Sequence, residues 1–334
     1  AFCWGAALDK SSFYYYYYYY YKLGYIECGV PQGSVLGPLL FCIFINDLPL
    51  HIVNKAVALD LFADDSSLHT SSSGVKTAQS NLQEELNNVA KWCTCNKMIV
   101  HPQKNKSMVI TSRQKHQRAP LTLNLYLGSD PIEQVSVHKV LGVTIDEELK
   151  WSHHINNVTK AVSKNLFLLG KLRYYLDADA MRMFFHAHCL SHINYVSTVW
   201  SNSREVHLKK LNSLHRRAGK LIVPNPYLST SEKLQAAKII PLTQQFQLNT
   251  AVLVYKVKHG LAPKYIERLL TSSDNRYGSN KFILPKTRID LFKTSFAFSG
   301  ASVWNTLPVN VQSSGSLCSF KRNTKKHLFL NCAV

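Results

Sequence analysis

The sequence is short of acidic residues, and this shortage sets its charge. It has 20 Asp and Glu against 39 Lys and Arg in 334 residues, a formal charge of +19 at pH 7. Such a surplus predicts a polyanionic partner, either nucleic acid, anionic lipid or an acidic protein. A protein that is merely basic is the alternative. Hydrophobic residues make up 46% of the chain, which is enough for a real core and excludes a wholly disordered protein.

Long apolar runs and clustered cysteines are also lacking. No apolar run reaches 18 residues, so we expect no membrane-spanning helix and no membrane partner. Residues 1–4 do not form a basic leader followed by an apolar stretch, so we expect no secretory signal. Eight scattered cysteines are typical of a reducing compartment, and we expect an intracellular protein of the nucleus or cytoplasm. Because the sequence does not begin with Met, we treat it as a fragment.

The N-terminal segment is of low complexity. Residues 14–21 are an unbroken run of tyrosine, with neither the period of a helix face nor the alternation of a strand. A stacking platform for bases would interleave aromatic with basic residues, and this run does not. We assign residues 1–21 no function and regard them as non-native sequence.

Residues 22–150 show mixed helix and strand patterns. Apolar residues recur at helical spacing from Leu36 through Ile43 and Phe44, which predicts an amphipathic helix. The same spacing predicts a second amphipathic helix, marked by Leu82, Leu86, Val89 and Trp92. The apolar run 57–63 predicts a buried strand, followed by a turn carrying Asp64 and Asp65 and a second strand at 67–69. Further strands are expected over 121–127, where apolar and polar residues alternate, and over 140–145.

Beyond residue 150 the pattern becomes helical. Val158, Val162, Leu166 and Leu169 recur at the spacing of a helix face. We therefore expect an α+β fold, in which an antiparallel sheet over 22–150 bears the acidic turn and a mostly helical region covers 151–273. Residues 274–334 form a basic tail to which the pattern assigns no fold.

Two sets of side chains are candidates for metal chemistry. Adjacent carboxylates after an apolar run, as at Asp64 and Asp65, repel each other unless a proton or a cation neutralises them. Oxygen ligands favour hard cations such as Mg²⁺, whereas a solvated turn is the plain alternative. The second set is rich in His and Cys, and ordinary packing and solvent exposure account for it better than a metal site does. Its members are His186, His188, Cys189 and His192.

Two linked motifs resemble those of reverse transcriptases, most closely the enzymes of non-LTR (LINE-type) retrotransposons. The first is the glycine-proline stretch 29–38, and the second is Phe62-Ala63-Asp64-Asp65, some 24 residues further on. Two matches in the right order are far more specific than either alone. Residues 92–104 resemble the next motif of the family, with a lysine near the triphosphate. Residues 138–143 resemble its primer-grip hairpin, and later helices resemble the region after the polymerase.

The resemblance implies a function for particular residues. It implies an N-terminally truncated fragment, with a polymerase palm remnant over 22–150 and a thumb over 151–273. The reaction implied is two-metal nucleotidyl transfer onto a primer 3′-hydroxyl, with Mg²⁺ as the ion and Mn²⁺ as the alternative. The partners implied are an RNA template, a DNA primer and deoxynucleoside triphosphates. The site residues implied are Asp64 and Asp65 for catalysis and metal binding, Gly29, Pro31, Gln32, Gly33 and Lys104 for nucleotide and template, and Leu141 and Gly142 for the primer grip.

One part of the family pattern is missing. The family carries another catalytic Asp in a Phe-Asp context upstream of the glycine-proline loop, and here only Asp9 and Glu27 precede Gly29. Because two Asp of one turn hold two hydrated ions poorly, we expect that this chain does not polymerise DNA. A non-catalytic, basic nucleic-acid-binding remnant of a retrotransposon is the alternative. A basic protein–protein module unrelated to polymerases would leave the two motifs to coincidence.

Overall fold

The computed structural model describes residues 2–4, 33–118, 121–273 and 280–330, and the chain divides into two compact units. Unit 1 is Ala1–Leu149 and unit 2 is Lys150–Val334. The tyrosine run and the predicted site residues Gly29, Pro31 and Gln32 lie outside the described residues. Among the described helices, none combines the length and the apolar character needed to cross a membrane.

Unit 1 is built on a six-stranded sheet with the order β2-β3-β1-β4-β6-β5. Neighbouring strands pair antiparallel except β4 and β6, which are parallel. A separate antiparallel hairpin is formed by β7 and β8. The strands are β1 (Phe2–Trp4), β2 (Val57–Phe62), β3 (Asp65–Thr70), β4 (Lys106–Met108), β5 (Leu125–Leu127), β6 (Asp130–Gln134), β7 (Val137–Val140) and β8 (Val143–Asp146).

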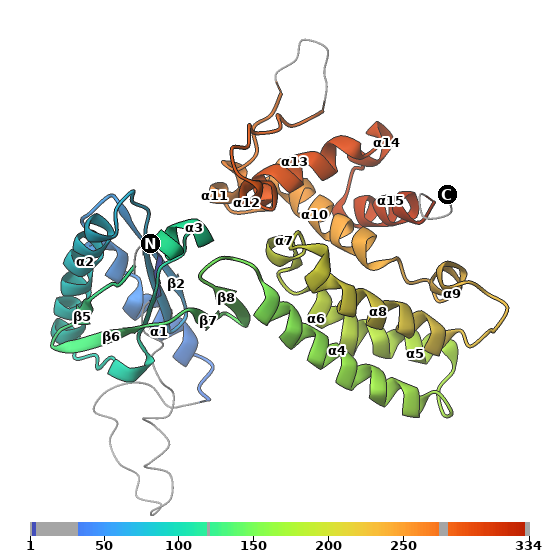
Figure 1. The fold of residues 1–334 in the computed structure, drawn as a ribbon, viewed down its shortest axis with the longest axis horizontal. Coiled ribbons are helices and arrows are strands. Elements are labelled where there is room, and N and C mark those ends of the chain that lie inside the picture. The colour runs from blue at the N-terminus through green and yellow to red at the C-terminus, as the bar shows by residue number, and fades with distance from the viewer. Residues whose placement is uncertain (1, 5–32, 119–120, 274–279, 331–334) are drawn as a thin grey trace, which may run out of the picture. The chain divides into compact units, whose positions relative to one another are not determined.

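One long helix covers one face of this sheet (Figure 1). Helix α2 (Val75–Cys95) contacts β2, β3 and β5, and its buried residues Leu82, Leu86 and Trp92 recur at helical spacing as the sequence predicts. The remaining helices of unit 1 are α1 (Gly37–Ile45), η2 (Leu48–His51), η3 (Pro102–Lys104) and α3 (Arg113–Arg118).

The buried acid Glu85 of α2 anchors the loop before β2. Its Oε1 accepts hydrogen bonds from the backbone N–H groups of Val53, at 3.1 Å, and Asn54, at 2.6 Å. Its Oε2 accepts a third from Asn88 Nδ2 at 3.1 Å. These charge-assisted bonds satisfy a carboxylate that would otherwise be costly to bury, and they fix where the hairpin of β2 and β3 begins.

Helix α1 corrects one prediction. The helix forms where expected, but the predicted packing face is exposed, with Leu39 57% and Ile43 64% accessible. The core of unit 1 instead takes Phe41 and Ile45, which lie one turn apart and pack toward Trp92. Because α1 is apolar almost all round, its periodicity could not indicate which side would be buried.

Three strand predictions need correction. The strand expected over 121–127 is confined to β5, and that expected over 140–145 is a hairpin whose turn is Leu141-Gly142. The strand expected to be buried, β2, is buried on one face only. A reversal at Leu141-Gly142 is feasible because both residues have positive φ, 45° and 83°, as in the tight turns of hairpins.

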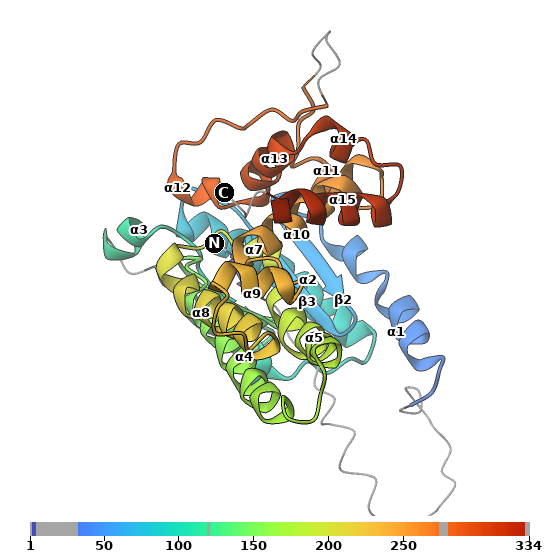
Figure 2. The same cartoon turned by 90° about the vertical axis from the view of Figure 1, so that its right-hand side faces the viewer.

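Unit 2 is almost entirely helical (Figure 2). The turn at 186–190 is a π-helical segment that continues α5 into α6. The helices are α4 (Ser152–Leu172), α5 (Ala178–Phe185), α6 (Ser191–Asn194), α7 (Ser197–Trp200), α8 (Glu205–Ile222), α9 (Thr230–Ala236), α10 (Leu242–Lys258), α11 (Lys264–Glu267), α12 (Asp290–Lys293), α13 (Phe296–Thr306), α14 (Val309–Gln312) and α15 (Leu317–Leu330). The α+β class expected from the sequence is confirmed.

Two groups of helices build the interior of unit 2. The four apolar residues predicted as a helix face in α4 are all buried, and α4 packs on α8. Helix α9 packs close to α8 at Gly219, where an added Cβ would lie 2.8 Å from the Leu234 side chain. Helices α13 and α15 pack on α10 around Trp304 and Phe320. Residues 280–330, for which the sequence pattern gave no fold, are therefore largely helical and share a core with α10.

Candidate polymerase site

The two predicted catalytic acids lie at the tip of the hairpin formed by β2 and β3. The strands are in register with Phe62 opposite Asp65, so Ala63 and Asp64 form a two-residue turn. Ala63 has a φ of 51°, a left-handed conformation that costs a non-glycine residue free energy. Asp64 therefore lies in the turn as predicted, whereas Asp65 is the first residue of β3 and not a turn residue.

The pleat of the hairpin separates a core face from an open face. The side chains of Val57, Leu68 and Thr70 are buried on the core face. Side chains alternate along a strand, so Asp65 lies on the same face as Ser67 and His69 and not with the buried Leu68. On this open face His69 Nδ1 lies 3.4 Å from Asp60 Oδ2. Neither Asp60 nor His69 was predicted from the sequence. The period of two counted forward from Asp65 reaches His69, whereas Asp60 reaches this face through the register that sets Phe62 opposite Asp65.

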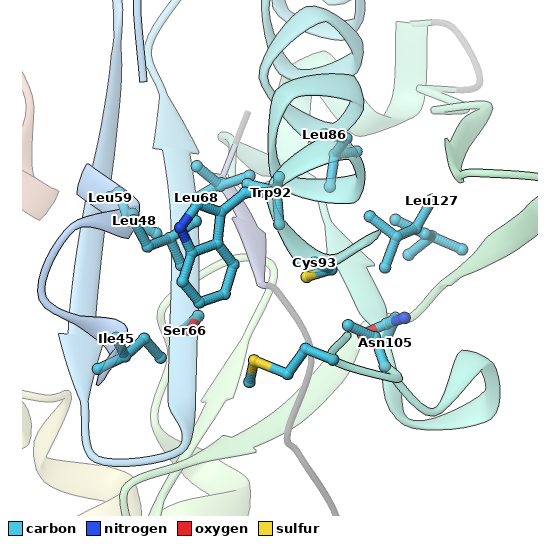
Figure 3. A pocket seen from close by; sticks show the side chains of 14 residues that line it. Ile45, Leu48, Leu59, Ser66, Leu68, Leu86, Trp92, Cys93, Asn105 and Leu127 are labelled. Carbon is cyan, nitrogen blue, oxygen red and sulfur yellow. The ribbon is translucent and has the colours of Figure 1, made fainter. Parts of the chain in front are cut away.

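A small apolar cavity lies beneath the hairpin (Figure 3). Its volume is about 50 Å³, and its wall includes Leu68 from β3 and Trp92 and Cys93 from α2. Burial of Cys93 raises the pKa of its thiol, which keeps the sulfur protonated and unreactive. Because the cavity is apolar and lies on the core face, it is a packing space and not a substrate site.

The predicted primer-grip hairpin comes close to the acidic strand. His138, on β7, is influenced by charges on two other strands of unit 1. Burial and the nearby Lys106 ammonium lower the pKa of His138, while Asp65 acts in the opposite direction. Lys106 in turn forms an ion pair with Glu133 at 2.5 Å. The structure thus brings β3, β4 and β7 into one electrostatic neighbourhood, which their separation in sequence does not reveal.

The remaining predicted residues lie on two other segments of unit 1. Gly33, immediately before α1, has a φ of 84° and no described atom near the position of an added Cβ, so the backbone conformation itself requires glycine. Lys104 ends η3, next to β4, and is half-buried. Leu141 and Gly142 are exposed at the turn of β7 and β8.

The described residues do not supply a complete divalent-metal site. Nowhere in the described ranges do three or more His, Cys, Asp or Glu residues gather as metal ligands could. Asp64 and Asp65 are thus two carboxylates without a third from the described chain. Mg²⁺ with so few protein ligands depends on water and substrate phosphates to complete its shell.

The cluster of His186, His188, Cys189 and His192 in unit 2 likewise does not meet in space as a metal site within the described residues. Cys189 is fully buried, and burial raises the pKa of its thiol to about 12. His188 packs on Phe184 with ring centroids 4.5 Å apart. Packing, the plainer of the two interpretations offered by the sequence, describes this cluster.

The charge of the molecule is concentrated in unit 2. Unit 1 has 12 Lys and Arg against 13 Asp and Glu, a formal charge of −1, whereas unit 2 has 27 against 7, a formal charge of +20. On α8 five exposed cations form one stripe, and among the described residues none of them has a hydrogen bond or an ion pair. They are Lys209, Lys210, Arg216, Arg217 and Lys220. Such a stripe fits a polyanion such as a phosphate backbone.

A protein family and several known proteins resemble this chain. Residues 11–145 match the family model described as reverse transcriptase (RNA-dependent DNA polymerase). The probable RNA-directed DNA polymerase from transposon BS of Drosophila melanogaster is 30% identical over 213 residues, which cover 60% of this chain and 23% of that protein. The RNA-directed DNA polymerase from mobile element jockey of the same species is 27% identical over 253 residues, 73% of this chain and 26% of that protein.

A third relative is also a protein of a retrotransposable element. The retrovirus-related Pol polyprotein from type-1 retrotransposable element R1 2 of Nasonia vitripennis is 24% identical over 182 residues, 52% of this chain and 43% of that protein. The chain spans about a quarter of the length of the two Drosophila melanogaster proteins. The resemblance that the two sequence motifs indicate is thereby confirmed.

Proposed function

We propose a function for this chain from the premise that its residues 11–145 belong to the reverse transcriptase family, in the form carried by non-LTR retrotransposons. The chain is a palm and thumb portion of an RNA-directed DNA polymerase. Its partners are an RNA template, a DNA primer and deoxynucleoside triphosphates. It holds template and primer but does not extend the primer by itself.

The proposed roles follow the positions of the residues in unit 1. Asp64 and Asp65 are the acids that would face the metal ions, which enzymes of this family use. Mg²⁺ is the ion proposed, with Mn²⁺ as the alternative, because the available ligands are hard oxygens. Gly29, Pro31, Gln32, Gly33 and Lys104 are assigned to nucleotide and template, and Leu141 and Gly142 to the primer. The nearness of β7 to Asp65 supports this grouping.

A single observation carries the proposal that polymerisation fails. The acids at the tip of β2 and β3 have no third metal-ligating partner among the described residues. Two-metal transfer needs ligands that grip both ions against their hydration shells. The only acids before Gly29 are Asp9 and Glu27, and neither stands in the Phe-Asp context of the family.

Template–primer extension tests this proposal. Full-length chain and Asp64→Ala are incubated with an RNA template, a DNA primer and the four nucleotides, once with Mg²⁺ and once with Mn²⁺. We expect extension by the chain to be no greater than by Asp64→Ala. Extension that is present in the chain and abolished in Asp64→Ala would refute the proposed inactivity and establish the catalytic role of Asp64.

A second candidate function is a basic nucleic-acid-binding protein without polymerase geometry, and the charge of +20 on unit 2 favours it. Binding to a recessed primer–template and to a blunt duplex of the same sequence separates the two. The polymerase portion prefers the recessed end, whereas a purely electrostatic binder treats the two ligands alike. In both cases affinity falls steeply with salt, because bound cations displace counterions. A flat salt response would contradict both functions.

A further inference from the structure

The end of α4 and the turn after it expose aromatic side chains that no described residue covers. Phe167 is 65% accessible, Tyr174 75% and Tyr175 85%. Large aromatic residues are normally buried for much of their surface. Three exposed rings within nine residues of a basic helix therefore require an explanation other than the core of unit 2.

Cations interleave with these rings. Lys160, Lys164, Phe167 and Lys171 follow one another at spacings of three and four and so share the exposed face of α4. Lys171 Nζ lies 5.6 Å from the ring centroid of Phe167. The Arg173 guanidinium carbon lies 4.8 Å from that of Tyr174. Cation–π contacts of this kind hold the rings and the charges side by side.

The nearby acids do not cancel this charge. Helix α4 contains no Asp or Glu. In the next helix the Asp177 side chain caps α5 by accepting the N–H of Ala180 at 2.7 Å, and Asp179 pairs with Arg182 at 2.8 Å. The four cations of α4 and its turn therefore remain available to an anionic ligand.

The turn presents its tyrosines on a fixed backbone. The N–H of Tyr175 and that of Leu176 both donate to the Leu172 carbonyl, at 2.9 and 3.1 Å. Leu176 is half-buried, whereas the two tyrosines before it are exposed. A ring held outward on an ordered turn loses little freedom when a planar group stacks on it.

We propose that this aromatic-basic platform, formed by Lys160, Lys164, Phe167, Lys171, Arg173, Tyr174 and Tyr175, binds single-stranded RNA by stacking bases on its rings and pairing phosphates with its cations. Alternating aromatic and basic side chains suit unpaired bases, whose faces are open. The bases of a duplex are stacked on each other and cannot reach such rings. The choice of RNA rests on the proposed function, in which the unpaired strand is the template.

The test measures binding of the full chain to a short labelled single-stranded RNA by fluorescence anisotropy. Tyr174→Ala combined with Tyr175→Ala should weaken binding roughly tenfold or more, since stacking contributes substantially per base. Replacing both by Phe keeps the rings and should restore affinity. Tyr227→Ala is the matched control, because Tyr227 is 93% exposed but lies in the loop before α9, outside the platform. It should leave binding unchanged.

Charge and stacking are then separated by salt. Changing Lys164, Lys171 and Arg173 to Gln should reduce the slope of log affinity against log salt by about 2, at ~0.7 for each phosphate contact with a single strand. The tyrosine variants should keep the slope of the unaltered chain. All substituted side chains are exposed or lie at the surface, so circular dichroism and thermal unfolding should match the unaltered chain.

Several outcomes would overturn the platform. Alanine variants that bind single-stranded RNA as tightly as the unaltered chain would do so, and so would an equal loss of affinity for duplex RNA. A tyrosine-dependent preference for single-stranded DNA would overturn the assignment to RNA. Recessed primer–template binding with no tyrosine-dependent RNA binding refutes the platform but leaves the proposed polymerase function intact. Failure to bind any of these nucleic acids refutes both.

Discussion

Unit 1 and unit 2 differ sharply in charge, and this difference fits the proposed division of tasks between a unit that binds metal ions and a unit that binds nucleic acid. Unit 1 has a formal charge of −1 and carries the acidic hairpin, whereas unit 2 has a formal charge of +20. A site that binds cations benefits from surroundings that are not positive, because like charges weaken ion binding. A surface that binds phosphates requires the reverse. Separating the charges between units satisfies both requirements within one chain.

The largest expected effect comes from the basic stripe on α8. Changing Lys209, Lys210, Arg216, Arg217 and Lys220 to Gln should weaken binding to single-stranded nucleic acid at low salt by at least about a hundredfold. The slope of log affinity against log salt should fall by as much as about 3.5, at ~0.7 per contact. Anisotropy titrations at several salt concentrations measure both quantities.

A control in unit 1 completes this comparison. Five exposed lysines of unit 1 are changed to Gln, which alters the total charge by the same amount. They are Lys55, Lys76, Lys91, Lys97 and Lys115. The division of tasks predicts a much smaller loss of affinity than for the α8 variant. Equal losses would mean that total charge matters and that the distribution between the units does not.

This charge division also shows what the sequence could and could not predict. The surplus of Lys and Arg over Asp and Glu and the two motifs that resemble reverse transcriptases could be found in the sequence. Composition and the spacing of nearby residues can be determined without knowing the tertiary structure. The α+β class and the helix faces of α2 and α4 followed from periodicity for the same reason. Which side of α1 is buried did not follow, because that helix is apolar almost all round.

The candidate site was predictable only in part. The spacing of Phe62 to Asp65 indicated a hairpin turn, yet it could not show that Asp65 would already belong to β3. Whether two residues pair across a turn depends on the strand register, and Ala63 adopts a left-handed conformation that composition does not favour. The nearness of His138 to Asp65 depends on strands far apart in sequence. No local pattern encodes such a contact.

The next largest effect concerns the unfolding free energy at low pH, in which the two units should differ. His215 of α8 is fully buried with both ring nitrogens unpartnered among the described residues, and it packs on Phe185. Burial, reinforced by the neighbouring His186, lowers the pKa of His215 from 6.5 to about 4. Burial lowers the pKa of His186 as well, and the nearby cations Lys325 and Arg182 add to that shift.

The sign of the pH dependence follows from this lowered pKa. Between pH 6.5 and about 4 the unfolded chain binds a proton at His215 that the folded chain refuses. Unit 2 should keep this contribution to its stability above pH 6.5 and lose about 3 kcal/mol as the pH falls to 4. Urea unfolding at stepped pH values measures the loss. In His215→Leu the unfolding free energy of unit 2 should depend less steeply on pH in this range, because the contribution of His215 is gone. An unchanged pH dependence would contradict the attribution of the loss to His215.

The buried carboxylate of Glu85 stabilises unit 1. Glu85→Ala leaves the backbone N–H groups of Val53 and Asn54 without their acceptor. We expect a loss of about 2 kcal/mol in the unfolding free energy of unit 1, because buried donors would become unsatisfied. Urea denaturation measures it, with Lys91→Ala as an exposed control on the same helix. Equal stability of the two variants would show that the loop before β2 does not depend on Glu85.

The smallest expected effect would sharpen the comparison by stabilising unit 1 alone. Leu141 adopts a φ of 45° in the turn of β7 and β8 and is followed by Gly142 at 83°. Asn-Gly is the pair that such turns favour, and a left-handed conformation costs a residue like Leu roughly 1 kcal/mol. Leu141→Asn should therefore raise the unfolding free energy of unit 1 by up to about 1 kcal/mol. Gly142→Ala, which cannot adopt its φ without strain, should lower it by a similar amount. Both are measured by urea unfolding, and because neither residue belongs to unit 2, its transition should stay where it is. A destabilised Leu141→Asn would show that contacts of the Leu141 side chain outweigh the strain of its backbone.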